Sequence, residues 1–424
     1  MVDTARFNKK DLPRLPVLAR LVDLGFNYLT PTQALAARRG KIGNVLLEDI
    51  LKERLGYINR IPYKGSEHRF TEENIRLAIE KLKSVKHQGL VRTNETVHER
   101  LTLGLSLEQP LEEYARSFTL RYIDWQNWER NAFHVTVRFP IADRRGTETI
   151  ELDIVLFVNG IPFVVIECAP SCVPIDQAIA QSIRNQRESH FPGPPGSNPE
   201  SRYSPDQNIL GQNIFSYVQL VLATNQDTAQ FGTIGTPARF WSTWKERDWK
   251  THLEKYPADQ DHESPALLSI ASSPKSPRKP NRREKPSDTG YATTLHGLCS
   301  PERLLELIYK FSVFDNGIKK MARYQQYFAV KRILSHIRVL DANGRRRGGI
   351  VWHTQGSGKS LTMVMLARSL AEEPGILNPR IVLITDRKDL DEQIKDTFAA
   401  CDMAPQRAKT GRDLLELVSE QKAG

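Results

Sequence analysis

The sequence predicts an α/β protein in which two domains are joined by a linker. Apolar residues between positions 118 and 224 follow the short period of strands, interrupted by one helical stretch. A segment rich in Ser-Pro and Lys-Pro pairs comes next, and beyond it a strand, a glycine turn, a helix and a second strand succeed one another as in a βαβ unit. The 424 residues are enough for two or three domains with full cores.

The first predicted domain covers residues 1–254 and begins with a helical lead-in. Between Asn44 and Arg100 apolar residues recur at steps of three and four, which is typical of helices. The strands that we expect after it have the sequences RYIDW, AFHVTVRF, IELDIVLFV, IPFVVIEC and YVQLVLATN, with a helix over residues 175–187 before the last.

Residues 255–295 are the predicted linker, because their composition could not form a core. The segment from Ser273 to Lys285 contains six Lys or Arg and only one Glu, so this basic run could contact nucleic acid phosphates. A solvated tether is the favoured interpretation.

Charge and cysteine content narrow the class of protein. Sixty Lys and Arg against fifty Asp and Glu leave a net charge of +10, which suits a polyanionic partner such as nucleic acid. Four cysteines are too few for a disulfide framework, and we expect free thiols in a reducing cytoplasm. No apolar run approaches the roughly 18 residues of a spanning helix, so no membrane association is expected.

The second predicted domain covers residues 296–424. Helices are expected over 302–311 and 324–337, followed by the strand GGIVWHT, a helix, the strand RIVLITD and a helix over 390–400. The sequence ends one βαβ unit after the glycine turn. We therefore expect an ATP-driven motor domain that is incomplete in this sequence.

The glycine turn at 354–360 has the sequence and the context of a phosphate-binding loop. Its glycines let backbone N–H groups surround phosphate oxygens, and the following helix adds its positive end. Lys359 would reach the β and γ phosphates, and the Ser360 hydroxyl would bind Mg²⁺. His353 replaces the glycine of the strict pattern. ATP hydrolysis also requires an acidic pair after a later strand, and Asp391-Glu392 is better explained as a solvated helix start.

Two carboxylates flank a predicted hairpin turn at Asn159-Gly160. Asp153 and Glu167 on adjacent strands could hold a divalent metal for phosphodiester hydrolysis, although two unrelated strand-end acids are the alternative. A simple two-residue turn would pair Asp153 with Ile166 and put the acids on opposite faces. We therefore expect either a three-residue turn or one bulge, which would bring both onto one face.

Seven motifs of the sequence together resemble those of a known family. They are RYIDWQNWERNAFHV, DIVLFVNGIPFVVIEC, IDQAIAQSIRNQ, FGTIGTPARFWSTW, ARYQQYFAVKRIL, WHTQGSGKSLTM and LITDRKDLDEQ. The sequence resembles the restriction (R) subunit of type I restriction-modification enzymes over nearly its whole length. The resemblance implies a PD-(D/E)xK nuclease domain followed by a superfamily 2 DNA translocase with RecA-like parallel-sheet domains.

The resemblance also implies roles for individual residues. Asp153 and Glu167 match the metal-binding acids, and Gln181 matches a glutamine often found beside them. Gln326 matches an adenine-reading glutamine, with Arg323 and Tyr324 in its motif. The phosphate loop is matched by Thr354, Gly356, Ser357, Gly358, Lys359 and Ser360, and a further helicase motif near the DNA path by residues 385–387.

One position departs from the nuclease pattern, which has lysine where this sequence has Ala169. That lysine would orient the attacking water and stabilise charge on the phosphate. We expect slow or absent cleavage, whether the lysine was lost in this protein or removed deliberately. Arg184 or Asn185 could approach the site from the neighbouring helix, but arginine stays protonated and could help only electrostatically.

The leading functional hypothesis is a motor and nuclease subunit that uses ATP and Mg²⁺ on double-stranded DNA. Its expected partners are the methyltransferase (modification) subunit and the specificity subunit, which reads the DNA site. Two alternatives stay open: a catalytically inert docking and DNA-binding module, and a P-loop ATPase whose N-terminal domain is structural.

Overall fold

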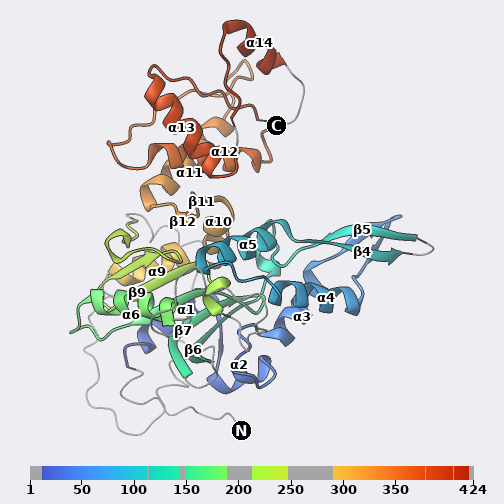
Figure 1. Ribbon diagram of the computed structural model, residues 1–424, viewed down its shortest axis with the longest axis vertical. Helices are drawn as coiled ribbons and strands as arrows, with labels where there is room; N and C mark the ends of the chain where they lie inside the picture. The colour runs from blue at the N-terminus through green and yellow to red at the C-terminus, as the bar shows by residue number, and fades with distance from the viewer. Residues whose placement is uncertain are drawn as a thin grey trace, which may run out of the picture. The chain divides into compact units, whose positions relative to one another are not determined.

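The computed structural model describes residues 12–111, 114–142, 149–188, 213–246, 290–377, 379–403 and 405–419 (Figure 1). The chain forms two compact units, residues 1–306 and 307–424. Positions 255–289 of the predicted linker, with its basic run, lie outside the described residues. The end of that predicted linker enters the helix α9 (Gly290–Cys299), in which Gly297 lies directly against the indole of Trp244.

A six-stranded sheet is the centre of the first unit. Its order is β1-β6-β7-β8-β9-β10. The strands are β1 (Asn27–Leu29), β6 (Phe133–Ala142), β7 (Thr149–Val158), β8 (Ile161–Cys168), β9 (Leu220–Thr224) and β10 (Ala229–Gly232). β1 runs parallel to β6 and β8 parallel to β9, whereas the other neighbours are antiparallel.

The two central strands are apolar on both faces. Every residue from Ile154 to Val158 and from Phe163 to Ile166 is fully buried. Such continuous apolar runs form where both faces of a sheet are covered. The covering helices include α6 (Ile175–Glu188) against β8 and β9, α1 (Leu15–Asp23) against β6, and α9 against β10.

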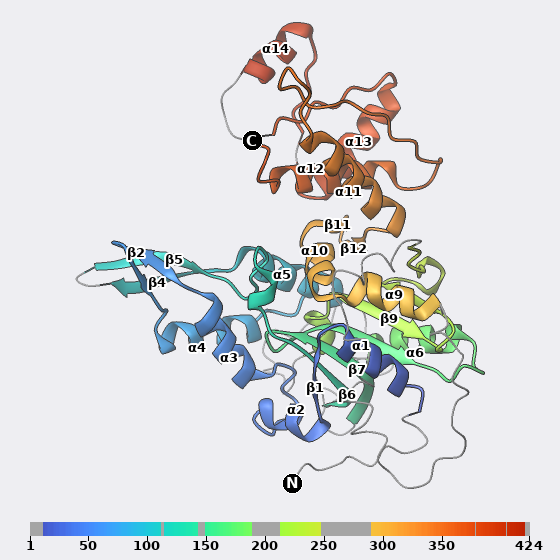
Figure 2. The same cartoon turned by 180° about the vertical axis from the view of Figure 1, so that it is seen from behind.

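A helical layer with a projecting arm precedes the central strands, as Figure 2 shows from behind. Its elements are α2 (Pro31–Ala37), α3 (Glu48–Ile58), β2 (Ile61–Tyr63), β3 (Ser66–His68), α4 (Glu72–Lys83), α5 (Leu90–Leu103), β4 (Leu105–Leu111) and β5 (Tyr114–Leu120). The hairpin β4–β5 extends away from the sheet, and Arg116 on it covers the ring of Tyr63 at 5.1 Å. Short 3-10 turns follow at Trp128–Arg130, Ile214–Ser216 and Ala238–Phe240.

The predicted strand RYIDW is wrong. Residues 121–125 form a loop, although Tyr122 and Ile123 are fully buried. The loop is held by side chains instead of a ladder, since Asn131 donates to the Asp124 carbonyl and accepts its backbone N–H. Polar side chains that satisfy local backbone groups compete with strand pairing. The other predicted strands of this unit and the helix over 175–187 are confirmed.

The second unit contains mainly helices. Its elements are the end of α10 (Pro301–Lys310), β11 (Ser312–Asp315), β12 (Ile318–Met321), α11 (Tyr324–Arg338), α12 (Lys359–Ala371), α13 (Lys388–Ala400) and α14 (Gly411–Ser419). β11 and β12 form a two-stranded hairpin. The helices expected in this region are confirmed.

The expected parallel sheet of this unit is not formed among the described residues. Segments 348–354 and 380–386 are irregular, and Ile350, Trp352 and Ile384 are 95%, 89% and 88% exposed. The strand predictions there are therefore wrong for this structure. A parallel strand requires a neighbouring strand to accept its hydrogen bonds, and neither apolar segment has one in the described part of the unit.

Candidate active site

The turn between β7 and β8 is fixed by its own backbone and by its neighbours. Asn159 and Gly160 have φ angles of +51° and +80°, as a two-residue hairpin turn with two left-handed residues requires. The Gly160 carbonyl accepts the N–H of Leu47 at 2.8 Å. The Asn159 side chain donates to the Tyr122 carbonyl at 3.0 Å and to Asn131 Oδ1 at 2.8 Å. The start of β8 is therefore held at a defined position.

A bulge then changes the register of the hairpin. Phe157 lies opposite Pro162, but Leu156 lies opposite Val164, so Phe163 is the extra residue of β8. The next pairs lead to Ile154 opposite Ile166, and thus to Asp153 opposite Glu167. Opposed residues of an antiparallel pair share one face of the sheet. The prediction of a bulge that brings both acids together is confirmed.

Asp153 is held by a backbone group and by a distant arginine. Its Oδ2 accepts the N–H of Cys168 at 2.8 Å. Its Oδ1 accepts Nε of Arg14 at 2.7 Å and also Nη2 of the same guanidinium. Arg14 additionally lies 3.5 Å from Glu151. A charged group thus neutralises Asp153 directly at the hairpin.

Glu167 has a different environment. Its side chain is buried, and burial, followed by the negative charge of Asp153, raises the pKa of Glu167 from 4.5 to about 8. A hydrogen bond from Asn185 Nδ2 to Glu167 Oε1, 2.8 Å long, opposes this rise. The side chain of Asn185 is oriented in turn by Gln181, whose Nε2 donates to Asn185 Oδ1 at 2.7 Å. One polar relay from α6 therefore ends on this acid.

Gln181 and Asn185, both expected near the hairpin, lie beside it on α6, and Asn185 belongs to the buried face of that helix. Asn185 is 1% exposed and belongs to that face together with Ile179. Arg184 is exposed on the opposite side and adds no charge to the acids. Ala169 is almost fully buried just after β8, and its N–H donates to the Thr224 carbonyl at 2.8 Å.

Arg14 is a residue of the candidate site that the sequence did not predict. It lies 139 positions before Asp153 in the chain, in a segment with no recognisable motif. The sequence shows only that Arg14 lies immediately before a helix, α1. The packing of that helix then decides where the Arg14 side chain lies. Such a contact depends on tertiary structure.

The donor set suits one divalent cation. Two carboxyl groups that interact this closely repel each other when both are ionised, and a cation between them would relieve that repulsion. Carboxylate oxygens are also the ligands that Mg²⁺ prefers. The described residues contain no group of three or more His, Cys, Asp or Glu side chains that could hold a metal. Asp153 and Glu167 would thus need water or phosphate oxygens to complete the shell.

The predicted phosphate loop is the turn before α12 in the second unit. Gly356 and Gly358 have φ angles of +74° and +81°, and Lys359 is the first residue of the helix. The Ser357 hydroxyl donates to the Thr354 carbonyl at 2.7 Å. The loop is exposed, and nothing lies within 4 Å of a Cβ built on Gly356.

Gln326 connects α11 to this loop. Its Nε2 donates to the Gly358 carbonyl at 3.1 Å, and its Oε1 accepts the backbone N–H of Arg323 at 2.9 Å. An amide has two N–H donors and two acceptor lone pairs, so one of each stays available. Gln326, Arg323 and the loop are brought together by the fold, as their shared assignment to a nucleotide site requires.

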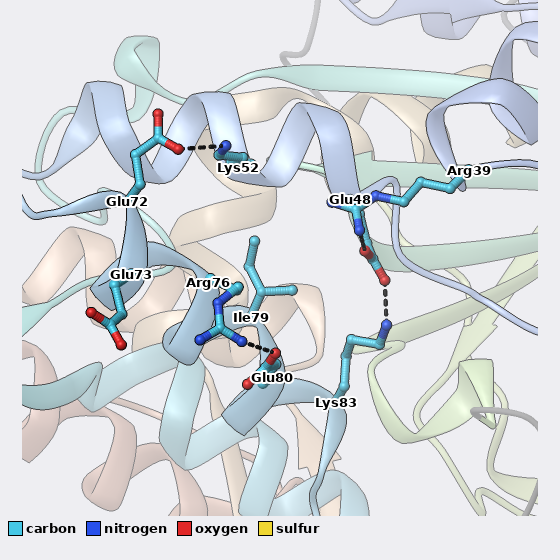
Figure 3. Close-up of a pocket in the computed structure, with 9 residues that line it drawn as sticks. All are labelled: Arg39, Glu48, Lys52, Glu72, Glu73, Arg76, Ile79, Glu80 and Lys83. Carbon is cyan, nitrogen blue, oxygen red and sulfur yellow. Dashed lines mark hydrogen bonds and ion pairs between the residues drawn. The ribbon is translucent and has the colours of Figure 1, made fainter.

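A separate cavity of about 480 Å³ lies between α3 and α4 (Figure 3). Its lining carries four basic and four acidic side chains, and ion pairs include Arg39 with Glu48 at 3.2 Å, Lys52 with Glu72 at 3.1 Å and Arg76 with Glu80 at 2.7 Å. None of the site residues expected from the sequence lines it. This cavity has no excess charge that would select an ionic ligand.

Two models of known protein families match parts of this chain. The family model for the N terminus of the type I restriction enzyme R protein matches residues 6–240, and that for the SWI2/SNF2 ATPase matches residues 325–424. The chain belongs to the type I restriction enzyme R protein family.

Curated relatives agree with this membership. The type I restriction enzyme HindI endonuclease subunit of Haemophilus influenzae is 27% identical over 98% of this chain and 35% of its own length. A putative type I restriction enzyme endonuclease subunit of Methanocaldococcus jannaschii is 23% identical over 100% of this chain and 37% of its own length. The chain thus spans little more than a third of these relatives, and it is an R subunit N-terminal region.

All four cysteines are free, as expected. No helix among the described residues combines the length and the apolar character needed to cross a membrane.

Proposed function

We propose that this chain carries the nuclease site and the first ATP-binding part of a type I restriction subunit, with the nuclease fold of the PD-(D/E)xK type. In the complete protein, ATP hydrolysis would drive translocation along double-stranded DNA, and the hairpin site would cleave DNA with Mg²⁺. The observation that carries the nuclease proposal is the bulge in β8, because it alone puts Asp153 and Glu167 on one face.

In the nuclease site, Asp153 and Glu167 would hold Mg²⁺. The metal would polarise the phosphodiester and favour the ionised form of water. The protein's own groups keep the ligands in place: the Cys168 N–H fixes Asp153, and Asn185, oriented by Gln181, fixes Glu167. Such neighbouring hydrogen bonds orient metal ligands and tune their basicity.

In the nucleotide site, the proposed ligand is ATP with Mg²⁺. Backbone N–H groups of 354–358 and the N-terminus of α12 would bind the phosphates, with Lys359 as the cation and Ser360 as the metal ligand. Gln326, beside Arg323, would read adenine with its remaining donor and acceptor. We propose that this chain binds ATP without turnover, since its sequence supplies no acidic pair after a later strand.

The proposed setting is a cytoplasmic complex with the modification and specificity subunits on double-stranded DNA. The names of the relatives support this setting, because each is an endonuclease subunit of a type I restriction enzyme. Sequence reading would belong to the specificity subunit.

Ala169 favours a second candidate function, a catalytically inert module that docks DNA and the other subunits. A buried alanine supplies no charge where the attacking water would need one. The third possibility, an ATPase with a merely structural N-terminal domain, does not explain why a buried polar relay ends on Glu167.

Restoring the lysine tests the choice between the first two. We expect Ala169→Lys to raise Mg²⁺-dependent nicking of plasmid DNA by about 100-fold or more, the range typical for one transition-state donor. Ala169→Met is the matched control, since it adds an unbranched side chain of nearly the same length without charge and should leave cleavage at the wild-type level. Asp153→Asn combined with Ala169→Lys should abolish the gain.

Each other outcome is informative. No cleavage by Ala169→Lys in a folded protein would favour the docking module. Rapid cleavage by the unchanged chain would contradict the expected loss of activity at Ala169.

A further inference from the structure

The guanidinium of Arg14 occupies the part of Asp153 that a metal would need. Asp153 Oδ1 accepts two N–H groups of Arg14, and Oδ2 accepts the N–H of Cys168. A carboxylate oxygen offers about two lone-pair sites. Oδ1 is therefore saturated by the arginine, and Asp153 also shares a side-chain hydrogen bond with Glu167.

The contact between Arg14 and Asp153 is largely buried and is positioned by the packing of α1. The side chains of Arg14 and Asp153 are 14% and 15% exposed, so little water competes for either group. Arg14 precedes α1 directly, and that helix is anchored through the buried residues Val17, Leu18 and Leu21. The packing of α1 thus delivers the guanidinium to the hairpin.

A divalent cation and this guanidinium would exclude each other. Both are attracted by the negative charge of Asp153, and like charges at a distance of a few Å repel strongly where water is largely absent. Moreover, the arginine already provides the charge compensation that makes a half-buried carboxylate stable without metal.

We propose that Arg14 is the internal counter-ion of the nuclease site and competes with the divalent metal for Asp153. The guanidinium holds Oδ1 in the metal-free protein and leaves it when the metal binds. Arg14 thereby sets the metal concentration at which the site fills. This inference rests on the proposed metal site, and it adds a residue outside the hairpin and α6 to that site.

The test is Mn²⁺ binding to the full 424-residue chain without nucleotide, followed by the electron paramagnetic resonance signal of free Mn²⁺. We expect Arg14→Gln to bind Mn²⁺ at least about tenfold more tightly than the wild type, a factor that corresponds to about 1.4 kcal/mol. Arg14→Lys keeps the charge without the planar fork, and its affinity should lie between the two.

Two controls isolate the competition. Arg20→Gln removes the same charge from α1 six positions further on and should leave Mn²⁺ affinity unchanged. In an Asp153→Asn background, Arg14→Gln should no longer matter, because the shared ligand is gone. Circular dichroism establishes whether each variant is folded. If Arg14→Gln does not fold, Arg14→Lys replaces it as the test variant.

The outcomes separate this inference from the proposed function. Mn²⁺ binding by the wild type with no gain in Arg14→Gln and Arg14→Lys would overturn the role of Arg14 alone. Absence of Mn²⁺ binding from every variant would overturn the metal site itself, and the inference with it. A gain that persists in the Asp153→Asn background would also contradict the competition.

Discussion

At the residue scale, two acids of one hairpin have unlike environments. Asp153 pairs with a guanidinium and a backbone N–H, whereas Glu167 is surrounded by apolar strands and receives one amide hydrogen bond. Burial and the charge of Asp153 therefore raise the pKa of Glu167. Pairs of acids whose environments differ in this way are frequent at functional sites, though structural networks also produce them.

The raised pKa predicts how stability depends on pH. In the folded protein the pKa of Glu167 is about 8, against 4.5 for a free side chain, so the folded state binds the proton more tightly. Between these values the folded state carries more protons than the unfolded state, and the free energy of unfolding falls as pH rises. We expect this decline from about pH 5 to pH 8 in urea titrations with EDTA.

Glu167→Gln should make the curve flatter over the same range. Glu73→Gln, at an exposed position of α4, is the control and should keep the wild-type slope. Equal slopes for wild type and Glu167→Gln would show that this acid is ionised in the folded state throughout the range.

At the scale of elements, the turn and the bulge act together. The Asn-Gly turn fixes the start of β8, and the extra residue Phe163 then shifts the register so that Asp153 and Glu167 lie on one face of the sheet. Gly160 has a second constraint, because a Cβ there would lie 2.5 Å from the Leu47 carbonyl oxygen. The turn is thus fitted to the backbone before α3.

Gly160→Ala tests this fit. A left-handed backbone costs a non-glycine residue about 1 kcal/mol, and the clash with Leu47 should add more, so we expect a loss of at least about 2 kcal/mol in the free energy of unfolding. Urea denaturation measures this loss in the free energy of unfolding.

Gly65→Ala is the matched control for this substitution. Gly65 has the same φ of +80°, but nothing lies within 4 Å of its added Cβ. It should therefore show the backbone cost alone. If both variants lost the same stability, the close approach at Leu47 would contribute nothing.

At the scale of the whole molecule, net charge bears on the partner. An excess of ten positive charges suits a DNA backbone held without sequence reading. We expect the affinity of the chain for duplex DNA to fall steeply between 50 and 200 mM salt and to be equal for unrelated sequences, as fluorescence anisotropy would measure.

Glutamine at the six basic positions between 273 and 285 tests whether that run takes part. An unchanged salt slope would support the solvated tether, and a shallower slope would support phosphate contacts. Affinity that is insensitive to salt, or that depends strongly on sequence, would contradict backbone binding altogether.

The sequence by itself determined the central strands, the helix α6, the glycine turn before α12 and the family. These features depend on local patterns: unbroken apolar runs, a turn dipeptide, and glycines before a helix. It also indicated a register shift, because the simple turn would have separated Asp153 from Glu167. The loop at 121–125 escaped this reasoning, since side-chain hydrogen bonds of Asn131 replaced a ladder there.

Only the tertiary structure decided which shift occurs and what surrounds the acids. The bulge at Phe163 depends on packing of the strands, and the contact of Arg14 with Asp153 depends on where α1 lies. Similarly, segments 348–354 and 380–386 have strand-like sequences yet no strand beside them among the described residues. Local sequence specifies a preference, whereas pairing and charge compensation require groups that are distant in the chain.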